Sequence, residues 1–221
     1  MIVERGRFIT LEGGEGAGKS TQLRRLAAVL AARGIDVVAT REPGGSPGAE
    51  EIRGLLVSGE PGRWDPMTEL LLHLAARRDH LLRKVRPALD AGRWVLSDRF
   101  ADSSVAYQGY GHGLGRDLVV RMHELAIGDF RPDLTVVLDL PVATGMARAR
   151  GRGAGEDRYE RMGTDFHERL RAGFLDLAAR EPGRCAVVDA DAPADEVEAR
   201  IRAVVEARLG AAADKRFVPP R

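Results

Sequence analysis

The most constraining feature of this sequence is a glycine-rich stretch near its beginning, Gly13-Gly14-Glu15-Gly16-Ala17-Gly18-Lys19-Ser20. It matches the pattern G-x-x-x-x-G-K-[ST] and lies between a strand-like run, Phe8 to Leu11, and a helical pattern, Thr21 to Ala32. In this context the pattern forms a phosphate-binding loop, because glycines let backbone N–H groups turn inward around an anion. The loop predicts contact of residues 13–21 with ATP, with Lys19 at the β- and γ-phosphates and Ser20 as a ligand of Mg²⁺.

A glycine-rich turn without a ligand is the alternative interpretation of this stretch. It leaves Lys19 unexplained, because the chain has only three lysines, Lys19, Lys84 and Lys215, among its 34 lysines and arginines. We therefore interpret the rest of the sequence on the basis of a bound nucleotide.

Composition restricts the class of protein further. The 221 residues, 44% of them hydrophobic and 30% charged, suit one globular domain of ordinary size. The formal net charge of +1 argues against nucleic acid or a membrane surface as a partner. The single Cys185 cannot form an intrachain disulfide, which favours the cytoplasm. No long apolar run or signal-peptide pattern is present, so we expect neither a membrane span nor export.

Apolar runs alternate with helical patterns along the chain. The predicted strands are Phe8–Leu11, Val37–Thr40, Trp94–Ser97, Leu134–Leu138 and Ala186–Val188. The predicted helices are Thr21–Arg33, Met67–Ala91, Asp117–Ile127, Val142–Arg150, Asp165–Ala179 and Ala194–Leu209, with Gly34, Gly92 and Gly128 as C-terminal caps. This order predicts an α/β fold with a five-stranded parallel sheet and helices on both faces. Residues 1–210 would form one domain, and residues 211–221 a flexible tail.

Two of the predicted strands end in charged residues. Arg41-Glu42 precedes a Pro-Gly-Gly turn, and Asp98-Arg99 follows the third strand. Ligands of open parallel sheets gather at the carboxyl ends of the strands, so these side chains are expected to face a ligand. A surface ion pair between Arg41 and Glu42 is the alternative, but contact of Arg41 with a phosphate or base suits the fixed turn better.

An acid at the end of an apolar strand is also the group that completes a Mg²⁺ site beside a phosphate loop. Asp98 is the first candidate for this role. Asp139 ends another apolar run in the same way, but no basic residue follows it in the sequence. We therefore prefer to interpret Asp139 as a strand-end or helix-entry residue.

The segment 148–158 begins as a helix and continues into glycines that alternate with arginines, including Arg152 and Arg158. A solvated loop with incidental charge is one interpretation. The preferred one is a lid whose guanidinium groups close over phosphates, with glycine as the hinge and arginine as the bidentate ligand.

Taken together, these motifs resemble those of bacterial thymidylate kinases, over about Phe8 to Leu209. The residues that carry the resemblance are Glu12 to Ser20, Thr40 to Gly45, Asp98-Arg99, Ser103-Ser104, Ala106-Tyr107-Gln108, Pro132-Asp133-Leu134 and Asp157 to Glu160. The resemblance implies phosphoryl transfer from ATP to dTMP with Mg²⁺, giving dTDP on the route to dTTP. It also implies a P-loop kinase core with a lid, and a homodimer.

The same resemblance implies roles for individual residues. Arg77 and Arg99 would bind the dTMP phosphate, Arg41 would lie near the transferred group, and Glu15 would approach the sugar 3′-hydroxyl. The nucleoside pocket would be lined by Pro43, Ser104, Tyr107, Gln108 and Tyr159. The catalytic residues would be Lys19, Arg41, Arg99 and a lid arginine, with Arg152 as first choice and Arg158 as second.

His73 departs from the family pattern, in which a Phe at this position commonly stacks on thymine. A histidine can also stack on a base, and a histidine of the helix surface or core is the alternative.

Two other functions are compatible with the motifs. One is a kinase for a different nucleoside monophosphate, and the other is a P-loop regulatory protein that switches a partner. A second group of phosphate-seeking arginines, Arg77 and Arg99, weighs against the regulatory protein because it implies a second phosphorylated ligand.

Overall fold

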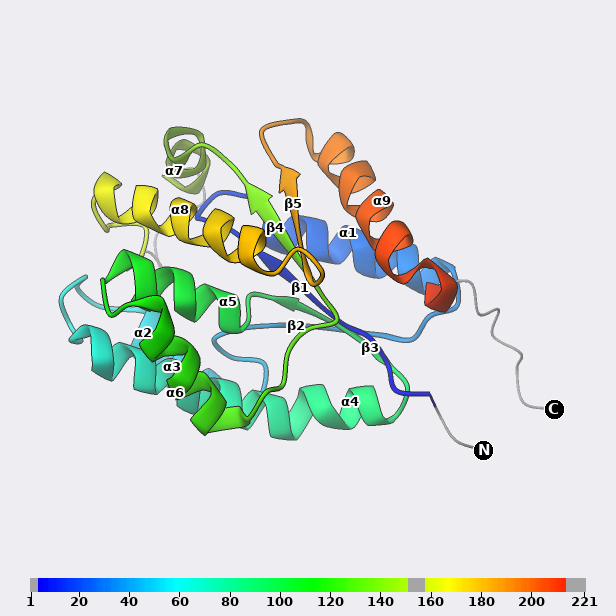
Figure 1. The fold of residues 1–221 in the computed structure, drawn as a ribbon, viewed down its shortest axis with the longest axis horizontal. Coiled ribbons are helices and arrows are strands. Elements are labelled where there is room, and N and C mark those ends of the chain that lie inside the picture. Colours follow the sequence, from blue (N-terminus) through cyan, green and yellow to red (C-terminus); the bar gives the residue numbers. More distant parts are fainter. Residues whose placement is uncertain (1–3, 151–157, 214–221) are drawn as a thin grey trace.

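The computed structural model describes residues 4–150 and 158–213, which form a five-stranded parallel sheet flanked by helices (Figure 1). The strands are β1 (Phe8–Glu12), β2 (Val37–Arg41), β3 (Trp94–Asp98), β4 (Leu134–Asp139) and β5 (Cys185–Asp189). Their order is β2-β3-β1-β4-β5, and every neighbouring pair is parallel. The predicted sheet is therefore confirmed, and the carboxyl ends of all five strands meet at one edge.

The helices cover both faces of the sheet, as predicted. They are α1 (Lys19–Ala32), α2 (Pro47–Val57), α3 (Pro66–His80), η1 (Leu81–Val85), α4 (Arg86–Asp90), α5 (Ala101–Ser104), η2 (Val105–Gly111), α6 (Arg116–Ile127), α7 (Val142–Arg150), α8 (Thr164–Arg180) and α9 (Ala194–Ala213). The glycines expected as caps, Gly34, Gly92 and Gly128, all have positive φ. In the described ranges, no helix has the length and apolar character that crossing a membrane requires.

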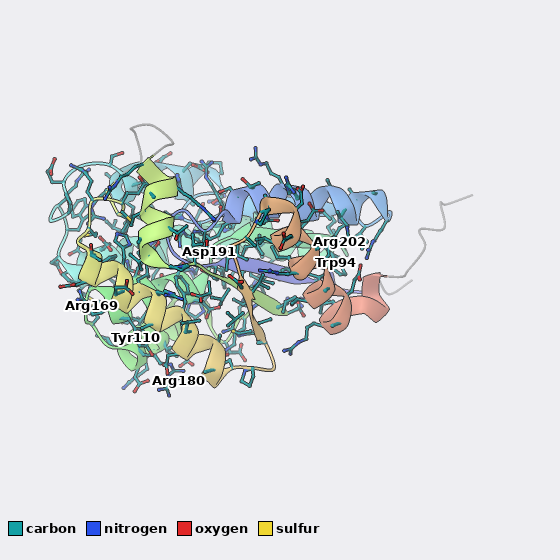
Figure 2. All side chains as sticks on the ribbon, turned by 90° about the horizontal axis from the view of Figure 1, so that it is seen from above. Trp94, Tyr110, Arg169, Arg180, Asp191 and Arg202 are labelled. Atoms are coloured by element: carbon teal, nitrogen blue, oxygen red, sulfur yellow. The ribbon has the colours of Figure 1, made fainter. Side chains whose placement is uncertain are left out.

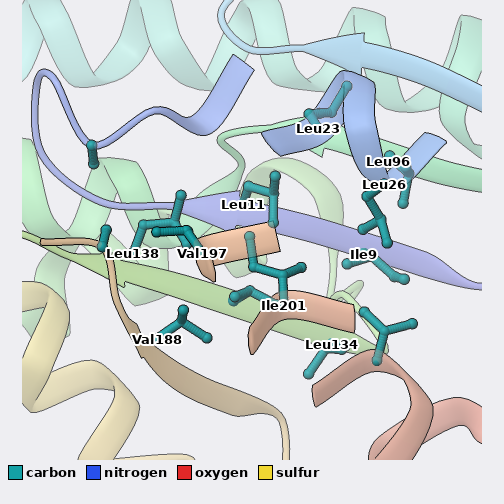
Figure 3. Packing of buried hydrophobic residues seen from close by; sticks show 14 of the residues in the cluster. Ile9, Leu11, Leu23, Leu26, Leu96, Leu134, Leu138, Val188, Val197 and Ile201 are labelled. Atoms are coloured by element: carbon teal, nitrogen blue, oxygen red, sulfur yellow. The ribbon is translucent and has the colours of Figure 1, made fainter. Parts of the chain in front are cut away.

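The core divides into layers because successive strand side chains point to opposite faces. Ile9 and Leu11 pack with Leu26 of α1 and Ile201 of α9 (Figure 3). The side chain of Phe8 points to the opposite face of the sheet from Ile9 and packs with η1, α4 and Phe100. Both faces of β1 are thus buried, which explains why its sequence is a continuous apolar run.

The helix predicted over 67–91 is a single helical path of three parts, α3, η1 and α4. The middle part is π-helical, and Pro87 lies at the start of α4. Proline has no N–H and its ring crowds the preceding turn, so a local change of hydrogen-bond register before Pro87 is expected.

Two helical segments were missing from the sequence prediction, α2 and the pair α5–η2. Helix α2 begins at Pro47-Gly48, which is more typical of a turn. The η2 segment packs against α8, and Figure 2 labels Tyr110 and Arg169 beside this helix. Arg169 donates to the Gly111 carbonyl at 2.8 Å, and Tyr110 bonds Asp176. Residues 151–157 of the predicted lid lie outside the described ranges, so the domain and lid boundaries stay predictions. Helix α9 extends three residues into the predicted tail.

Candidate functional site

The glycine-rich stretch forms the loop between β1 and α1. Gly13, Gly16 and Gly18 have φ of 135°, 72° and 85°, a region that favours glycine. Lys19 folds back over the loop and donates to the carbonyls of Gly13 and Gly14 at 3.1 and 2.7 Å. Burial and the charge of Arg99 lower the pKa of Lys19 to about 8. The ammonium is therefore mostly charged at neutral pH and lies at the position where a phosphate loop needs it.

A hydroxyl and a carboxylate meet beside this loop. Ser20 Oγ donates to Asp98 Oδ2 at 2.5 Å, which joins the start of α1 to the end of β3. Asp139, the competing acid, is held by Arg171 through two hydrogen bonds of 2.7 and 2.9 Å. The basic partner of Asp139 thus comes from α8, far along the chain, and the arrangement favours Asp98 as the metal ligand.

A cleft of about 400 Å³ opens at the carboxyl ends of the strands. It brings together most of the predicted site residues: Glu15, Gly16, Gly18, Lys19, Ser20, Arg41, Pro43, His73, Arg77, Asp98, Arg99, Ser104, Tyr107, Gln108 and Tyr159. Residues that the sequence reasoning did not assign also line it: Glu42, Arg53, Val57, Phe100, Ser103 and Glu160.

Arg99 lies between the phosphate loop and η2. Its guanidinium donates to the Gly13 carbonyl at 3.0 Å and to Glu15 Oε1 at 3.1 Å, and lies 4.9 Å from the centre of the Tyr107 ring. Its φ of 71° is in the left-handed region, which is uncommon for a residue with a side chain. Strain of this kind persists where the surrounding structure fixes the backbone, often at functional sites.

Glu15 accepts hydrogen bonds from both Tyr107 and Arg99. The Tyr107 hydroxyl donates to Glu15 Oε1 at 2.5 Å. Burial alone would raise the pKa of Glu15, but the charges of Arg99 and Lys19 lower it to about 2. Glu15 is therefore ionised and lies between Lys19 of the loop and Arg99, which follows β3.

The surface ion pair between Arg41 and Glu42, considered as an alternative, is not formed. Arg41 is half exposed and pairs with Glu50 of α2 at 3.1 Å. Glu42 is buried and accepts hydrogen bonds from Arg77 at 2.7 Å, and its other oxygen lies 2.9 Å from His80 Nδ1. The two neighbours therefore have separate roles, Arg41 at the mouth of the cleft and Glu42 in its wall.

Arg77 is buried and its contacts lie outside the phosphate loop. Besides Glu42, it donates to Ser104 Oγ at 2.9 Å and to the Phe100 carbonyl at 3.0 Å. It shares the cleft wall with Ser104 and Gln108, whereas Arg99 contacts Gly13 of the phosphate loop. These contacts do not favour the predicted role of Arg77 at the phosphate, whereas the contacts of Arg99 favour that role for Arg99.

His73 is part of the cleft wall and not a surface histidine. Its Nε2 lies 2.9 Å from the Tyr159 hydroxyl, and the two ring centres are 6.3 Å apart. Burial lowers the pKa of His73 to about 4, so the imidazole is neutral at physiological pH. A neutral ring that lines the cleft is compatible with the predicted contact to a base.

The two candidate lid arginines differ in what the structure shows. Arg152 lies outside the described residues. Arg158 is fully buried, pairs with Glu69 at 2.5 Å, and donates to the carbonyls of Leu56, Glu60 and Pro61. All of these partners lie in α2, α3 and their connection, so the arrangement counts against Arg158 as the catalytic arginine.

Sequence reasoning missed the buried acid Glu69, although a signal for it was present. Glu69, His73 and Arg77 are spaced four residues apart, so they lie on one face of α3. Polar residues repeated along the buried face of a helix indicate a site, because each must find a partner in the interior. Arg53, which donates to the Pro43 carbonyl at 2.7 Å, was missed because α2 itself was not predicted.

Comparison with known proteins supplies independent findings. The model of a family described as thymidylate kinase matches residues 11–201. A thymidylate kinase of Caulobacter vibrioides is 58% identical over 205 residues, which cover 93% of this chain and 98% of that protein. One of Dinoroseobacter shibae is 54% identical, covering 90% and 96%. The crystal structure of a thymidylate kinase from Ehrlichia chaffeensis has a TM-score of 0.74 and 35% identity, covering 91% of this chain and 99% of that one.

Proposed function

This chain belongs to the thymidylate kinase family, and on that premise we propose how its cleft carries out the reaction. The protein is a phosphotransferase that uses ATP to phosphorylate dTMP to dTDP in dTTP synthesis. The observation that carries the proposal is the continuity of the cleft, which is lined by the phosphate loop, Arg99 and the wall formed by Arg77, Ser104 and Tyr107. One cleft of this kind accommodates a donor and an acceptor nucleotide end to end.

Residues 13–21 would hold the ATP phosphates. The loop carbonyls that now accept from Lys19 Nζ are neutral, whereas a phosphate is anionic, so the ammonium would exchange these contacts for phosphate oxygens. Arg41, at the mouth of the cleft, would approach the transferred group. The charge that develops during transfer would then be offset by side chains that the fold already positions.

Arg99 would bind the dTMP phosphate beside the loop. Its contacts with Gly13 and Glu15 hold the guanidinium next to Lys19, and the planar fork suits two phosphate oxygens. The acceptor is itself an anion, so no side chain needs to remove a proton from it. In-line positioning and charge neutralisation are then the main contributions of the protein.

The nucleoside would lie along the remaining wall. Glu15 and Tyr107, which hydrogen-bond each other, would contact the sugar, with Glu15 near the 3′-hydroxyl. His73, Arg77, Ser104, Gln108, Pro43 and Tyr159 would surround the base. Because Arg77 contacts Glu42, Ser104 and the Phe100 carbonyl on the wall away from the phosphate loop, we propose a contact of Arg77 with the uncharged base in place of the phosphate contact predicted from the sequence.

The residues at the loop fit Mg²⁺, which the family implies. The Ser20 hydroxyl and the Asp98 carboxylate are adjacent oxygen donors, and Mg²⁺ prefers oxygen ligands and takes the rest from phosphates and water. Ser20 and Asp98 would hold the ion, which when bound neutralises charge on the nucleotide phosphates.

We also propose a homodimer and a cytoplasmic location. Leu71 on α3 and Leu118 and Leu125 on α6 are exposed, the two helices pack against each other, and a second copy of the chain would cover this apolar surface. The free, buried thiol of Cys185 suits a reducing compartment.

Transfer of labelled γ-phosphate from ATP to dTMP, followed by chromatography of the products, tests the proposal. The labelled product should be dTDP, and Lys19→Ala should form almost none while keeping the wild-type circular dichroism spectrum. Label released only as inorganic phosphate would contradict the proposal.

A further inference from the structure

Glu69, in the first turn of α3, is a buried carboxylate on which several elements converge. It is 0% exposed and accepts a hydrogen bond from Gln108 Nε2 at 2.7 Å. His112 Nε2 lies 3.1 Å from the same oxygen, and Arg158 Nη2 lies 2.5 Å from the other. Burial alone would raise the pKa of Glu69, but the nearby His112 and His73 and the hydrogen bond from Gln108 help to lower it to about 2. Glu69 is therefore a permanent negative charge in the interior.

Arg158 supplies the matching positive charge. Its guanidinium also donates to the backbone carbonyls of Leu56 in α2 and of Glu60 and Pro61 in the connection to α3, at distances of 3.1 to 3.2 Å. The ion pair therefore joins the chain that follows residue 157 to the beginning of α3. A buried charge left without its partner is strongly unfavourable, so each member of this pair fixes the position of the other.

The pair acts on the cleft first through Gln108. A carboxylate only accepts hydrogen bonds, so Glu69 requires the NH₂ end of the Gln108 amide to face it. The amide oxygen of this cleft-lining residue is then left as an acceptor, and it is buried without a partner in the described part of the chain. A donor on a ligand in the cleft would satisfy this acceptor.

The pair acts on the cleft a second time through Tyr159, the residue after Arg158. The Tyr159 ring lies 5.1 Å from the Arg158 guanidinium, and its hydroxyl bonds His73, one turn after Glu69 on α3. Burial and the Glu69 carboxylate hold the pKa of Tyr159 well above its ordinary value, so the hydroxyl keeps its proton. Both rings line the cleft.

We propose that Glu69 and Arg158 form a positioning pair that sets the base-binding end of the cleft by fixing Gln108, Tyr159 and His73. This inference rests on the proposed function, because it takes the base of the monophosphate substrate as the group bound there. Arg158 then acts through its neighbours and touches no phosphate. Arg99 and Lys19, in contrast, would contact the phosphates directly.

Enzyme kinetics distinguish an ion pair that positions the cleft residues from one that only stabilises the fold. Loss of stability lowers the fraction of active enzyme and the turnover number for every substrate alike, without changing Michaelis constants. Loss of positioning raises the Michaelis constant for dTMP and leaves that for ATP unchanged. The two roles are therefore separated by comparing the two substrates in a variant that is folded.

The double variant Glu69→Met/Arg158→Met provides that comparison. Replacing both members of a buried ion pair by apolar residues often preserves or increases stability, whereas Glu69→Gln alone leaves Arg158 uncompensated. The double variant leaves the carbonyls of Leu56, Glu60 and Pro61 without their donor, so we expect it to fold but to melt below the wild type. The folded variant should bind dTMP about tenfold more weakly by calorimetry, the size of one lost hydrogen bond. Its Michaelis constant for ATP should stay at the wild-type value, because Glu69 and Arg158 contact residues outside the phosphate loop.

Glu60→Gln is the matched control. The Glu60 side chain is exposed and pairs with Arg161 across the same two chain segments, away from Glu69. This variant should bind dTMP like the wild type. A folded double variant with wild-type dTMP affinity would overturn the positioning role. The positioning role is tested by dTMP binding, whereas the proposed function is tested by phosphorylation. The proposed function fails if the wild-type enzyme binds dTMP but does not phosphorylate it.

Discussion

At the scale of single residues, two acids at strand ends have the same sequence pattern and different surroundings. Asp98 bonds the Ser20 hydroxyl, whereas Asp139 is engaged by Arg171. Asp98→Asn should therefore raise the Mg²⁺ concentration needed for half-maximal turnover, with little change in stability. Asp139→Asn should lose about 1 kcal/mol or less of unfolding free energy, the usual range for a partly exposed pair, and keep the wild-type Mg²⁺ requirement. Metal titrations and urea unfolding of both variants check this, and a higher Mg²⁺ requirement in Asp139→Asn would reverse the assignment.

Glu12 should make the free energy of unfolding depend on pH. It is buried and accepts hydrogen bonds from the Phe100 N–H and the Ser103 hydroxyl, beside the strained Arg99. Burial and the nearby Asp102 raise its pKa from 4.5 to about 8. Between these two values the folded protein holds a proton that the unfolded chain has lost. The free energy of unfolding should therefore decrease as pH rises through this window.

Glu12→Gln cannot ionise and should lack this contribution. From about pH 5.5 to about pH 8.5 the wild type should lose more stability than the variant, because only the wild type must ionise a buried carboxyl. Urea unfolding at both pH values measures the difference. Parallel pH profiles for the two proteins would show that Glu12 does not titrate as inferred.

The sequence predicted which residues belong to the site better than it predicted which residues contact each other. Lys19, Ser20 and Asp98 follow from a local pattern, and the structure brings them together. Glu42 and Arg77 are 35 positions apart, and Arg158 and Glu69 come from different elements, so nothing local indicates that they pair. The burial of Arg158 depends on the packing of α2, a helix that the sequence pattern did not reveal.

At the scale of elements, helix α7 packs directly on the phosphate loop through glycine. A Cβ on Gly145 would lie 2.4 Å from the Glu15 carbonyl oxygen, and one on Gly16 would lie 2.0 Å from the Gly145 carbonyl oxygen. Gly145→Ala should therefore separate α7 from the loop, cost about 1–3 kcal/mol of stability, as overpacking usually does, and raise the Michaelis constant for ATP.

Gly54→Ala is the control for the intrinsic effect of alanine in a helix. Gly54 lies in α2, and no atom lies within 4 Å of its added Cβ. This variant should gain up to about 1 kcal/mol, because alanine favours helix over glycine. Unfolding curves and ATP kinetics of both variants make the comparison, and a Gly145→Ala protein as stable and active as the wild type would show that the contact is not required.

Some helices and strands have a clear local sequence pattern, and others do not. The strands were predictable because parallel strands buried on both faces have continuous apolar sequences. Helix α2 was not, because Pro47-Gly48 is typical of a turn and only the tertiary fold shows that Pro47 occupies the first helical turn. The π-helical break at Leu81–Val85 was also hidden within one long periodic pattern.

At the scale of the whole molecule, the apolar surface on α3 and α6 leads to a prediction about assembly. Leu71 and Leu125 are 49% and 81% exposed. If this surface joins two copies, Leu71→Glu/Leu125→Glu should be a folded monomer, because a C₂ interface would bury each new charge twice, once from each copy. Sedimentation velocity should show a dimer for the wild type. An unchanged sedimentation coefficient in the variant would place the interface elsewhere or exclude a dimer.

The central claim is that the cleft transfers phosphate from ATP to dTMP in preference to other monophosphates. Coupled ADP release, measured with dTMP, dUMP, CMP and AMP at matched ATP and Mg²⁺ concentrations, tests it most directly. We predict the highest kcat/KM for dTMP, because the chain belongs to the thymidylate kinase family. A higher kcat/KM for CMP or AMP would contradict the account, as would ATP binding without turnover on any of the four.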